Sequence, residues 1–239
     1  MKTMSALASI IIILLTLGCK SELIVEMDTL TPTPTPTSLS YLALGDSYTI
    51  GEGVSEPERY PVQLKDSLSK AGITIEQSQI VARTGWTTNE LSAGIDNANP
   101  TPPFNLVTLL IGVNNQYRGR SLENYREEFT QLLERAILFA GGDKSKVIVI
   151  SIPDWGVTPF AAGRDREKIA MEIDAFNAVN FEETNKIGVA YIDVTPISRE
   201  ATTRPELIAP DGLHPSGLMY KYWVDLLFPA AYDILKPQL

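Results

Sequence analysis

The sequence has only one histidine, His214, and only one cysteine, Cys19, among its 239 residues. These counts exclude an internal disulfide, a pair of catalytic histidines, and a zinc site built mainly from histidine and thiolate ligands. The net charge of −9 makes nucleic acid and anionic membrane surfaces poor partners, because their phosphates repel an acidic chain. Any histidine chemistry in this chain must therefore use His214.

The composition is that of a folded protein, with 44% hydrophobic and 21% charged residues. The first segment is an apolar run over residues 6–17, shorter than the roughly 20 apolar residues that span a bilayer. Gly18 and Cys19 follow it, and the segment resembles a bacterial lipoprotein signal, although Thr16 stands where that signal prefers leucine. The pattern predicts a signal peptide over residues 1–18 and lipidation of Cys19. An uncleaved anchor or an ordinary signal peptide is the alternative.

Alternating threonine and proline over residues 31–37 predicts a stiff, extended spacer, because proline removes backbone donors and restricts the residue before it. We therefore expect a membrane tether over residues 19–38 and one folded domain over residues 39–239. The expected location is the bacterial cell envelope, with the protein held by a lipid at Cys19 and facing outside the cytoplasm.

Apolar segments and helical periods alternate along the domain. The predicted strands are 41–44, 73–82, 106–111, 147–150 and 189–192, and the predicted helices are 59–70, 87–98, 122–140, 165–186 and 216–235. This alternation predicts an α/β fold, a three-layer sandwich in which helices cover both faces of a parallel sheet of about five strands. In the last helix, the spacing predicts a buried stripe of Leu218, Tyr222, Leu226 and Leu227, with Trp223 beside it.

Ligands of such sheets bind beyond the carboxyl ends of the strands, so residues that directly follow strands are the candidates for a site. Ser47 follows the first strand and offers a nucleophile. Gly85 follows the second and permits close approach of a backbone amide, and Asn114 follows the third and offers an amide donor. Asp211 stands three residues before His214, where it can fold back and fix the imidazole tautomer. Alone, each of these is weak evidence, because serine, glycine and asparagine are common in turns or helix caps, and a lone Asp-x-x-His is by default a polar surface loop.

Taken together, these residues resemble the four blocks of the SGNH/GDSL hydrolase family over about residues 40–239. The resemblance implies a flavodoxin-like fold and a serine esterase in which Ser47 is the nucleophile, His214 the base and Asp211 its orienting acid. It assigns the oxyanion hole to the backbone N–H groups of Ser47 and Gly85 and to the side chain of Asn114. It implies no metal and no cofactor. The implied substrates include lysophospholipids, short acyl esters and acetylated saccharides.

Two residues depart from the family pattern. Tyr48 replaces the usual leucine after the serine, and Asn115 replaces the usual aspartate of the third block. Asp154 and Asp193 also follow predicted strands, but only Asp211 has a spacing to the histidine that requires no long-range assumption.

Three aromatic residues, Trp86, Tyr117 and Trp155, follow strands and are candidates to line a substrate pocket, with packing under loops as the alternative. Arg83 and Arg118 are assigned to the solvated surface, with binding of a substrate carboxylate or phosphate as the alternative.

Two other functions compete with the esterase. A catalytically silent envelope lipoprotein that binds an ester or sugar would keep the same cleft. Nucleotide binding is weaker, because the glycine-rich segment 45–53 lacks the Gly-Lys-Ser/Thr of a phosphate-binding loop and carries two acids.

Overall fold

The computed structural model of the chain describes residues 38–236. The predicted signal peptide, the lipidation site Cys19 and the Thr/Pro spacer lie outside the described residues and stay predictions from the sequence. Among residues 38–236, no helix is both long enough and apolar enough to cross a membrane.

A single sheet of five parallel strands forms the centre of the domain, in the order β2-β1-β3-β4-β5. The strands are β1 (Leu39–Gly45), β2 (Ile75–Ala82), β3 (Leu106–Leu110), β4 (Val147–Ile150) and β5 (Ala190–Ile192). β1, β3 and β4 are buried along their whole length, as apolar strands covered on both faces must be. The predicted parallel sheet is confirmed.

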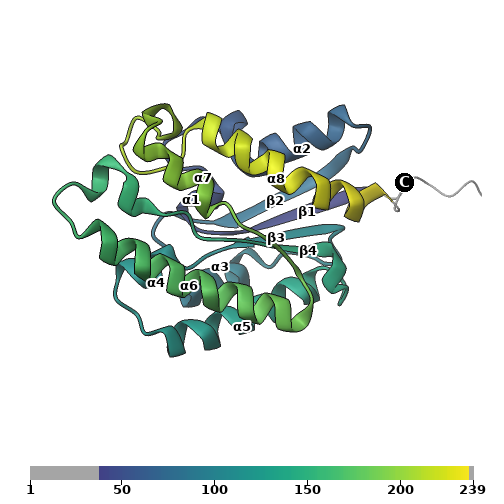
Figure 1. Ribbon diagram of the computed structural model, residues 1–239. Helices are drawn as coiled ribbons and strands as arrows, with labels where there is room; N and C mark the ends of the chain where they lie inside the picture. The colour runs from purple at the N-terminus through teal and green to yellow at the C-terminus, as the bar shows by residue number, and fades with distance from the viewer. Residues whose placement is uncertain (1–37, 237–239) are drawn as a thin grey trace, which may run out of the picture. The chain divides into compact units, whose positions relative to one another are not determined.

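Helices form a layer on each side of the sheet, which completes the predicted three-layer sandwich. α2 and α8 pack together on one face, and α3, α5 and α6 cover the other (Figure 1). The longer helices are α2 (Tyr60–Lys70), α3 (Thr88–Ala98), α5 (Leu122–Phe139), α6 (Arg166–Ile187) and α8 (Gly217–Leu235).

Several short helices were not predicted, because four or five residues are too few to establish a helical period. They are α1 (Ser47–Ile50), α4 (Val113–Tyr117) and α7 (Thr195–Arg199). The 3-10 turns are Glu56–Glu58, Lys144–Lys146, Trp155–Val157, Pro159–Ala161, Glu200–Thr202 and Pro205–Leu207. α1, α4 and α7 start within a few residues of the ends of β1, β3 and β5, so they shape the edge of the sheet where the candidate residues stand.

The buried stripe of α8 was predicted wrongly in part. Leu218 and Leu226 are 39% and 42% exposed, whereas Leu227 and Trp223 are fully buried. The side chains that face the interior are Met219, Tyr220, Trp223, Val224, Leu227, Ala231 and Leu235. The helix is apolar over most of its surface, so leucine spacing alone suggested a face rotated away from the one that packs on the sheet and α2.

Adjacent leucines of α8 provide a test of this orientation. Leu227→Ala should lower the free energy of unfolding by about 2–5 kcal/mol, because it leaves a cavity in the core. Leu226→Ala, the matched control, should change it by less than about 0.5 kcal/mol. Urea denaturation of the two variants measures both values, and equal losses would contradict the assigned face.

Candidate active site

The register of β1 with its two neighbours, β2 and β3, brings distant parts of the chain to one place. Gly45, the last residue of β1, pairs with Ala82 of β2 on one side and with Leu110 of β3 on the other. The segments that follow these three residues therefore leave the sheet at the same edge. They contain Ser47, Gly85 and Asn114.

The short helix α1 fixes the backbone at Ser47. The Asp46 carboxylate caps the helix by accepting the N–H of Tyr48 at 3.0 Å. Burial raises the pKa of Asp46 to about 7, although hydrogen bonds from the backbone N–H groups of Tyr48 and Asp46 itself oppose the shift. Among the described residues its second oxygen, Oδ2, has no hydrogen-bond partner. This acid is therefore partly protonated near neutral pH, directly before the candidate nucleophile.

His214 and Asp211 are joined within one tight turn that precedes α8. The carboxylate oxygen Oδ2 of Asp211 lies 2.7 Å from Nδ1 of His214, and Oδ1 accepts the backbone N–H groups of Leu213 and His214 at 2.9 and 3.0 Å. Burial alone would raise the pKa of Asp211, but these hydrogen bonds outweigh it and hold the pKa below its ordinary value. A charged Asp211 accepts the proton of Nδ1, which leaves Nε2 as the basic nitrogen of the ring.

The loops after β2 and β3 are tied to each other. The Asn114 side-chain amide donates to the carbonyl of Trp86 at 2.9 Å, and Arg118 donates to the carbonyl of Gly85 at 2.6 Å. Arg118 also pairs with Glu90 at 3.2 Å. Within residues 38–236, the backbone N–H groups of Ser47 and Gly85 donate to no protein acceptor. Two amides beside the candidate nucleophile are thus free to bind a ligand oxygen.

These residues border a cleft of about 170 Å³. Its lining comprises Ser47, Tyr48, Thr84, Gly85, Val113, Asn114, Tyr117, Trp155, Phe160, Leu213 and His214. The structure therefore brings Ser47, Gly85, Asn114 and His214 to one cavity from four separate parts of the sequence, with Asp211 behind the histidine.

Two of the three aromatic residues predicted to line a substrate pocket do line the cleft, and one does not. Tyr117 and Trp155 line the cleft, and the prediction for Trp86 needs correction, because its ring is not part of the lining and rests on Gly94 of α3 instead. The contribution of Trp86 to the cleft is its carbonyl, which holds Asn114. Phe160 was missed, although its position shortly after β4 is the same signal that identified Trp155.

The other candidate acids and the second family departure have partners elsewhere. Asp154 pairs with Arg199 at 2.9 Å, and Asp193 accepts the hydroxyl of Ser151 at 2.8 Å. Asn115 is buried and connects α4 to α3 through two hydrogen bonds to Thr88, at 3.0 and 2.7 Å. Asp211 is thus the acid that contacts the histidine.

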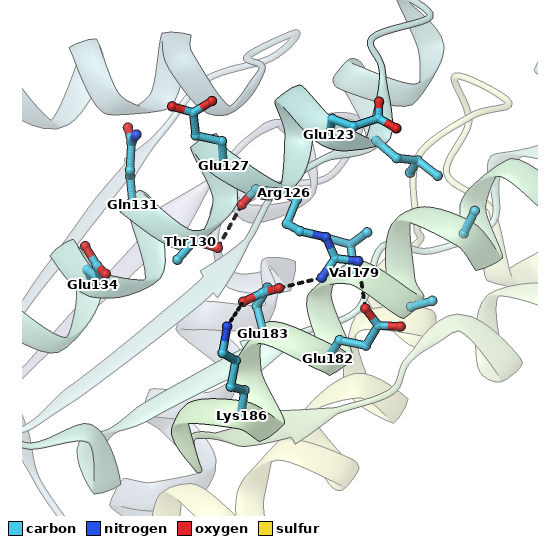
Figure 2. A pocket seen from close by; sticks show the side chains of 13 residues that line it. Glu123, Arg126, Glu127, Thr130, Gln131, Glu134, Val179, Glu182, Glu183 and Lys186 are labelled. Atoms are coloured by element: carbon cyan, nitrogen blue, oxygen red, sulfur yellow. Dashed lines mark hydrogen bonds and ion pairs between the residues drawn. The ribbon is translucent and has the colours of Figure 1, made fainter.

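A larger open groove of about 870 Å³ lies between α5 and α6. Figure 2 shows that charged side chains cross it: Arg126 donates hydrogen bonds to Glu182 and Glu183, and Lys186 forms an ion pair with Glu183. Its lining holds no histidine, serine or cysteine. The smaller cleft is therefore the candidate active site. Among the described residues, no group of three or more His, Cys, Asp or Glu side chains is arranged to hold a metal ion.

Comparison with known families agrees with this geometry. The model of the GDSL-like lipase/acylhydrolase family matches residues 43–222, three quarters of the chain. The chain belongs to the GDSL-like lipase/acylhydrolase family. It is accordingly a carboxylic ester hydrolase, as the sequence resemblance implied. No curated protein matches the sequence.

Solved structures of related enzymes share the fold. A lipase/acylhydrolase from Enterococcus faecalis is 22% identical, with a TM-score of 0.63 over 83% of this chain and 98% of that one. A phospholipase A1 from Streptomyces albidoflavus is 19% identical, with a TM-score of 0.61 over 82% and 99%. A variant of an acetyl-xylooligosaccharide esterase from Geobacillus is 17% identical, with a TM-score of 0.60 over 82% and 94%. These low identities establish the common fold alone.

Gly53 gives a test of how Asp211 is positioned. A Cβ at Gly53 would lie 2.6 Å from Oδ2 of Asp211, whereas a Cβ at Gly72 would meet nothing within 4 Å. Both glycines have left-handed backbones, with φ of 81° and 88°, so alanine at either should cost about 1–2 kcal/mol of stability. Only Gly53→Ala should also lower kcat for a neutral p-nitrophenyl ester, by about tenfold or more, because it displaces the carboxylate. Loss of kcat in Gly72→Ala as well would contradict this role.

Proposed function

We propose that the chain hydrolyses carboxylic esters through a Ser47–His214–Asp211 triad. The observation that supports this is that Ser47 and His214 line the same cleft, and that Oδ2 of Asp211 lies 2.7 Å from Nδ1 of His214. In this mechanism Nε2 of His214 takes the proton of the Ser47 hydroxyl as Oγ attacks the ester carbonyl. Asp211 keeps the proton on Nδ1 and stabilises the imidazolium that forms.

Attack on the carbonyl carbon converts the carbonyl oxygen into an oxyanion. The free N–H groups of Ser47 and Gly85 and the amide of Asn114 are the proposed donors to it, and one such donor typically stabilises the transition state by about 2.7–4 kcal/mol. The hydrogen bond from Asn114 to the carbonyl of Trp86 uses one of the two amide hydrogens and leaves the other for the substrate.

Collapse of the tetrahedral intermediate breaks the bond to the alcohol, which leaves with a proton from His214. The acyl group is then attached to Ser47 Oγ. Water, deprotonated by the same imidazole, attacks this acyl-enzyme and releases the carboxylic acid. No other histidine is present to share these steps.

The size of the cleft favours short acyl groups. A dry cavity of about 150 Å³ in another protein holds one benzene molecule. The cleft of about 170 Å³ therefore accommodates an acyl group of similar size, such as acetyl or butyryl, and part of its wall is aromatic. We propose short acyl esters, including acetylated saccharides, as substrates in preference to long-chain lysophospholipids.

Substitution of the nucleophile or the base tests the triad. Ser47→Ala and His214→Ala should each lower kcat for p-nitrophenyl acetate by about 10⁴–10⁶-fold, because one removes the proposed nucleophile and the other removes the only imidazole in the chain. Circular dichroism should show both variants folded, and the rate is followed by release of p-nitrophenolate. Substantial activity in either folded variant would refute the triad.

A covalent probe separates the enzyme from the catalytically silent alternative. A fluorophosphonate should label the unmodified chain at Ser47 and fail to label Ser47→Ala. His214→Ala should be labelled far more slowly, because its serine lacks a base. A chain that binds esters without hydrolysing or labelling would support the silent envelope lipoprotein.

A series of p-nitrophenyl esters tests the size of the acyl site. We expect kcat/KM to be highest for chains of about two to six carbons, the size that the cleft holds, and to fall by about tenfold or more at palmitoyl. Ser47→Ala supplies the background rate for each ester at the same detergent concentration. A maximum at palmitoyl would contradict the short-acyl preference.

A further inference from the structure

Three aromatic rings form one wall of the cleft. The centroid of the Trp155 ring lies 5.4 Å from that of Tyr117 and 5.9 Å from that of Phe160. Trp155 is buried, whereas Tyr117 and Phe160 are 46% and 43% exposed. We call these three side chains the aromatic wall. It extends from the interior of the cleft to the solvent.

Hydrogen bonds hold the buried member of the aromatic wall, Trp155, in place. The indole N–H of Trp155 donates to the side-chain oxygen of Gln116 at 2.8 Å, and the Gln116 amide donates to Glu172 at 2.7 Å. A buried tryptophan held in this way has little freedom to rotate. Groups that rest on the wall therefore keep a defined position relative to the cleft.

Arg164 contacts all three rings of this wall. Its guanidinium carbon is 5.3 Å from the centroids of all three rings, within the range of cation–π attraction. A guanidinium nitrogen also donates to the hydroxyl of Tyr117 at 3.2 Å. The position of the charge beside the aromatic wall is thus set by four contacts, although the side chain is exposed to solvent and is not itself part of the cleft lining.

The charge of Arg164 is not neutralised by the protein. The chain has 29 acidic residues against 20 lysines and arginines, so acid partners are plentiful. Arginines that do pair with acids are Arg118, Arg126, Arg135, Arg199 and Arg204. Within residues 38–236 the side chain of Arg164 has no acidic partner, and its only hydrogen-bond acceptor is the neutral hydroxyl of Tyr117. The adjacent Asp165 caps α6 through the N–H of Lys168.

We propose that Arg164 binds a negatively charged group, a carboxylate or a phosphate, carried by the ester substrate. A guanidinium has five N–H donors in a planar fork, and the bond to Tyr117 uses one of them. The remaining donors suit the two oxygens of a carboxylate or phosphate that projects from the cleft along the aromatic wall. This inference rests on the proposed ester hydrolysis and narrows its substrates to short acyl esters with an anionic group.

Matched ester pairs test the inference. On the acyl side, mono-p-nitrophenyl glutarate is compared with its neutral methyl ester. On the alcohol side, 1-butyrylglycerol 3-phosphate is compared with 1-butyrylglycerol. The proteins are the full chain and its Arg164→Gln and Arg164→Lys variants. Lys70→Gln is the charge-matched control, because Lys70 is exposed at the end of α2 that precedes β2, away from the carboxyl edge of the sheet.

We expect the full chain to prefer the anionic member of at least one pair. Arg164→Gln should lower kcat/KM for that ester by about tenfold or more, mainly through KM, because charged hydrogen bonds to the substrate are lost. It should change the neutral ester by less than twofold. Arg164→Lys should restore part of the preference, and Lys70→Gln should keep all of it. The pair that responds identifies whether the anion belongs to the acyl or the alcohol part.

The outcomes separate the two proposals. Absence of hydrolysis of all four esters, neutral and anionic, by the full chain would refute the proposed function itself. Hydrolysis without any preference for an anionic ester would refute the role of Arg164 alone. An equal loss for neutral and anionic esters in Arg164→Gln would also refute it, because that result means that Arg164 only holds the aromatic wall in place.

Discussion

The shared end point of β1, β2 and β3 is the constraint on which the cleft depends. β1 lies between the other two, and its last residue, Gly45, pairs with Ala82 and Leu110. The chain crosses to one side of β1 to form β2 and to the other to form β3, so the connections diverge at this point, where parallel sheets characteristically leave room for a ligand. A slip of one strand by one residue would reverse the faces of its side chains and move the loop that follows it.

The histidine reaches the same place by a different route. It follows no strand of the sheet, and its position depends on the turn before α8, where the Asp211 carboxylate accepts two backbone N–H groups as well as the imidazole. The carbonyl of His214 in turn accepts the N–H of Ala209 at 2.8 Å, which closes the loop. This geometry is local to the turn, and the helix that follows it, α8, packs on α2. Gly53, in the loop that follows α1, lies close to the carboxylate of Asp211. This contact places the turn against that loop.

The sequence was sufficient for the parts of the structure that local signals determine. Short apolar segments located four of the five strands, and β2 was recognised as strand-like although its centre, residues 76–79, is polar. Residues after strands located Ser47, Gly85 and Asn114. The orientation of α8 could not be read, because a helix that is apolar on most sides gives several equivalent stripes. The ring of Trp86 could not be placed either, because an aromatic residue after a strand can point to the cleft or to a neighbouring helix. Arg164 gave no signal, since its position depends on three rings that meet only in the fold.

The replacement of the usual aspartate by Asn115 has an electrostatic explanation in its surroundings. The Asn115 amide donates to the hydroxyl oxygen of Thr88, and that hydroxyl donates its single hydrogen to Glu128. An aspartate at position 115 would compete with Glu128 for this one hydrogen and would bring a second carboxylate to the same hydroxyl. The amide accepts the backbone N–H of Thr88 and still supplies a donor. The two residues thus have complementary roles. Glu128 of α5 supplies the negative charge that accepts the Thr88 hydrogen, and neutral Asn115 connects α4 to α3.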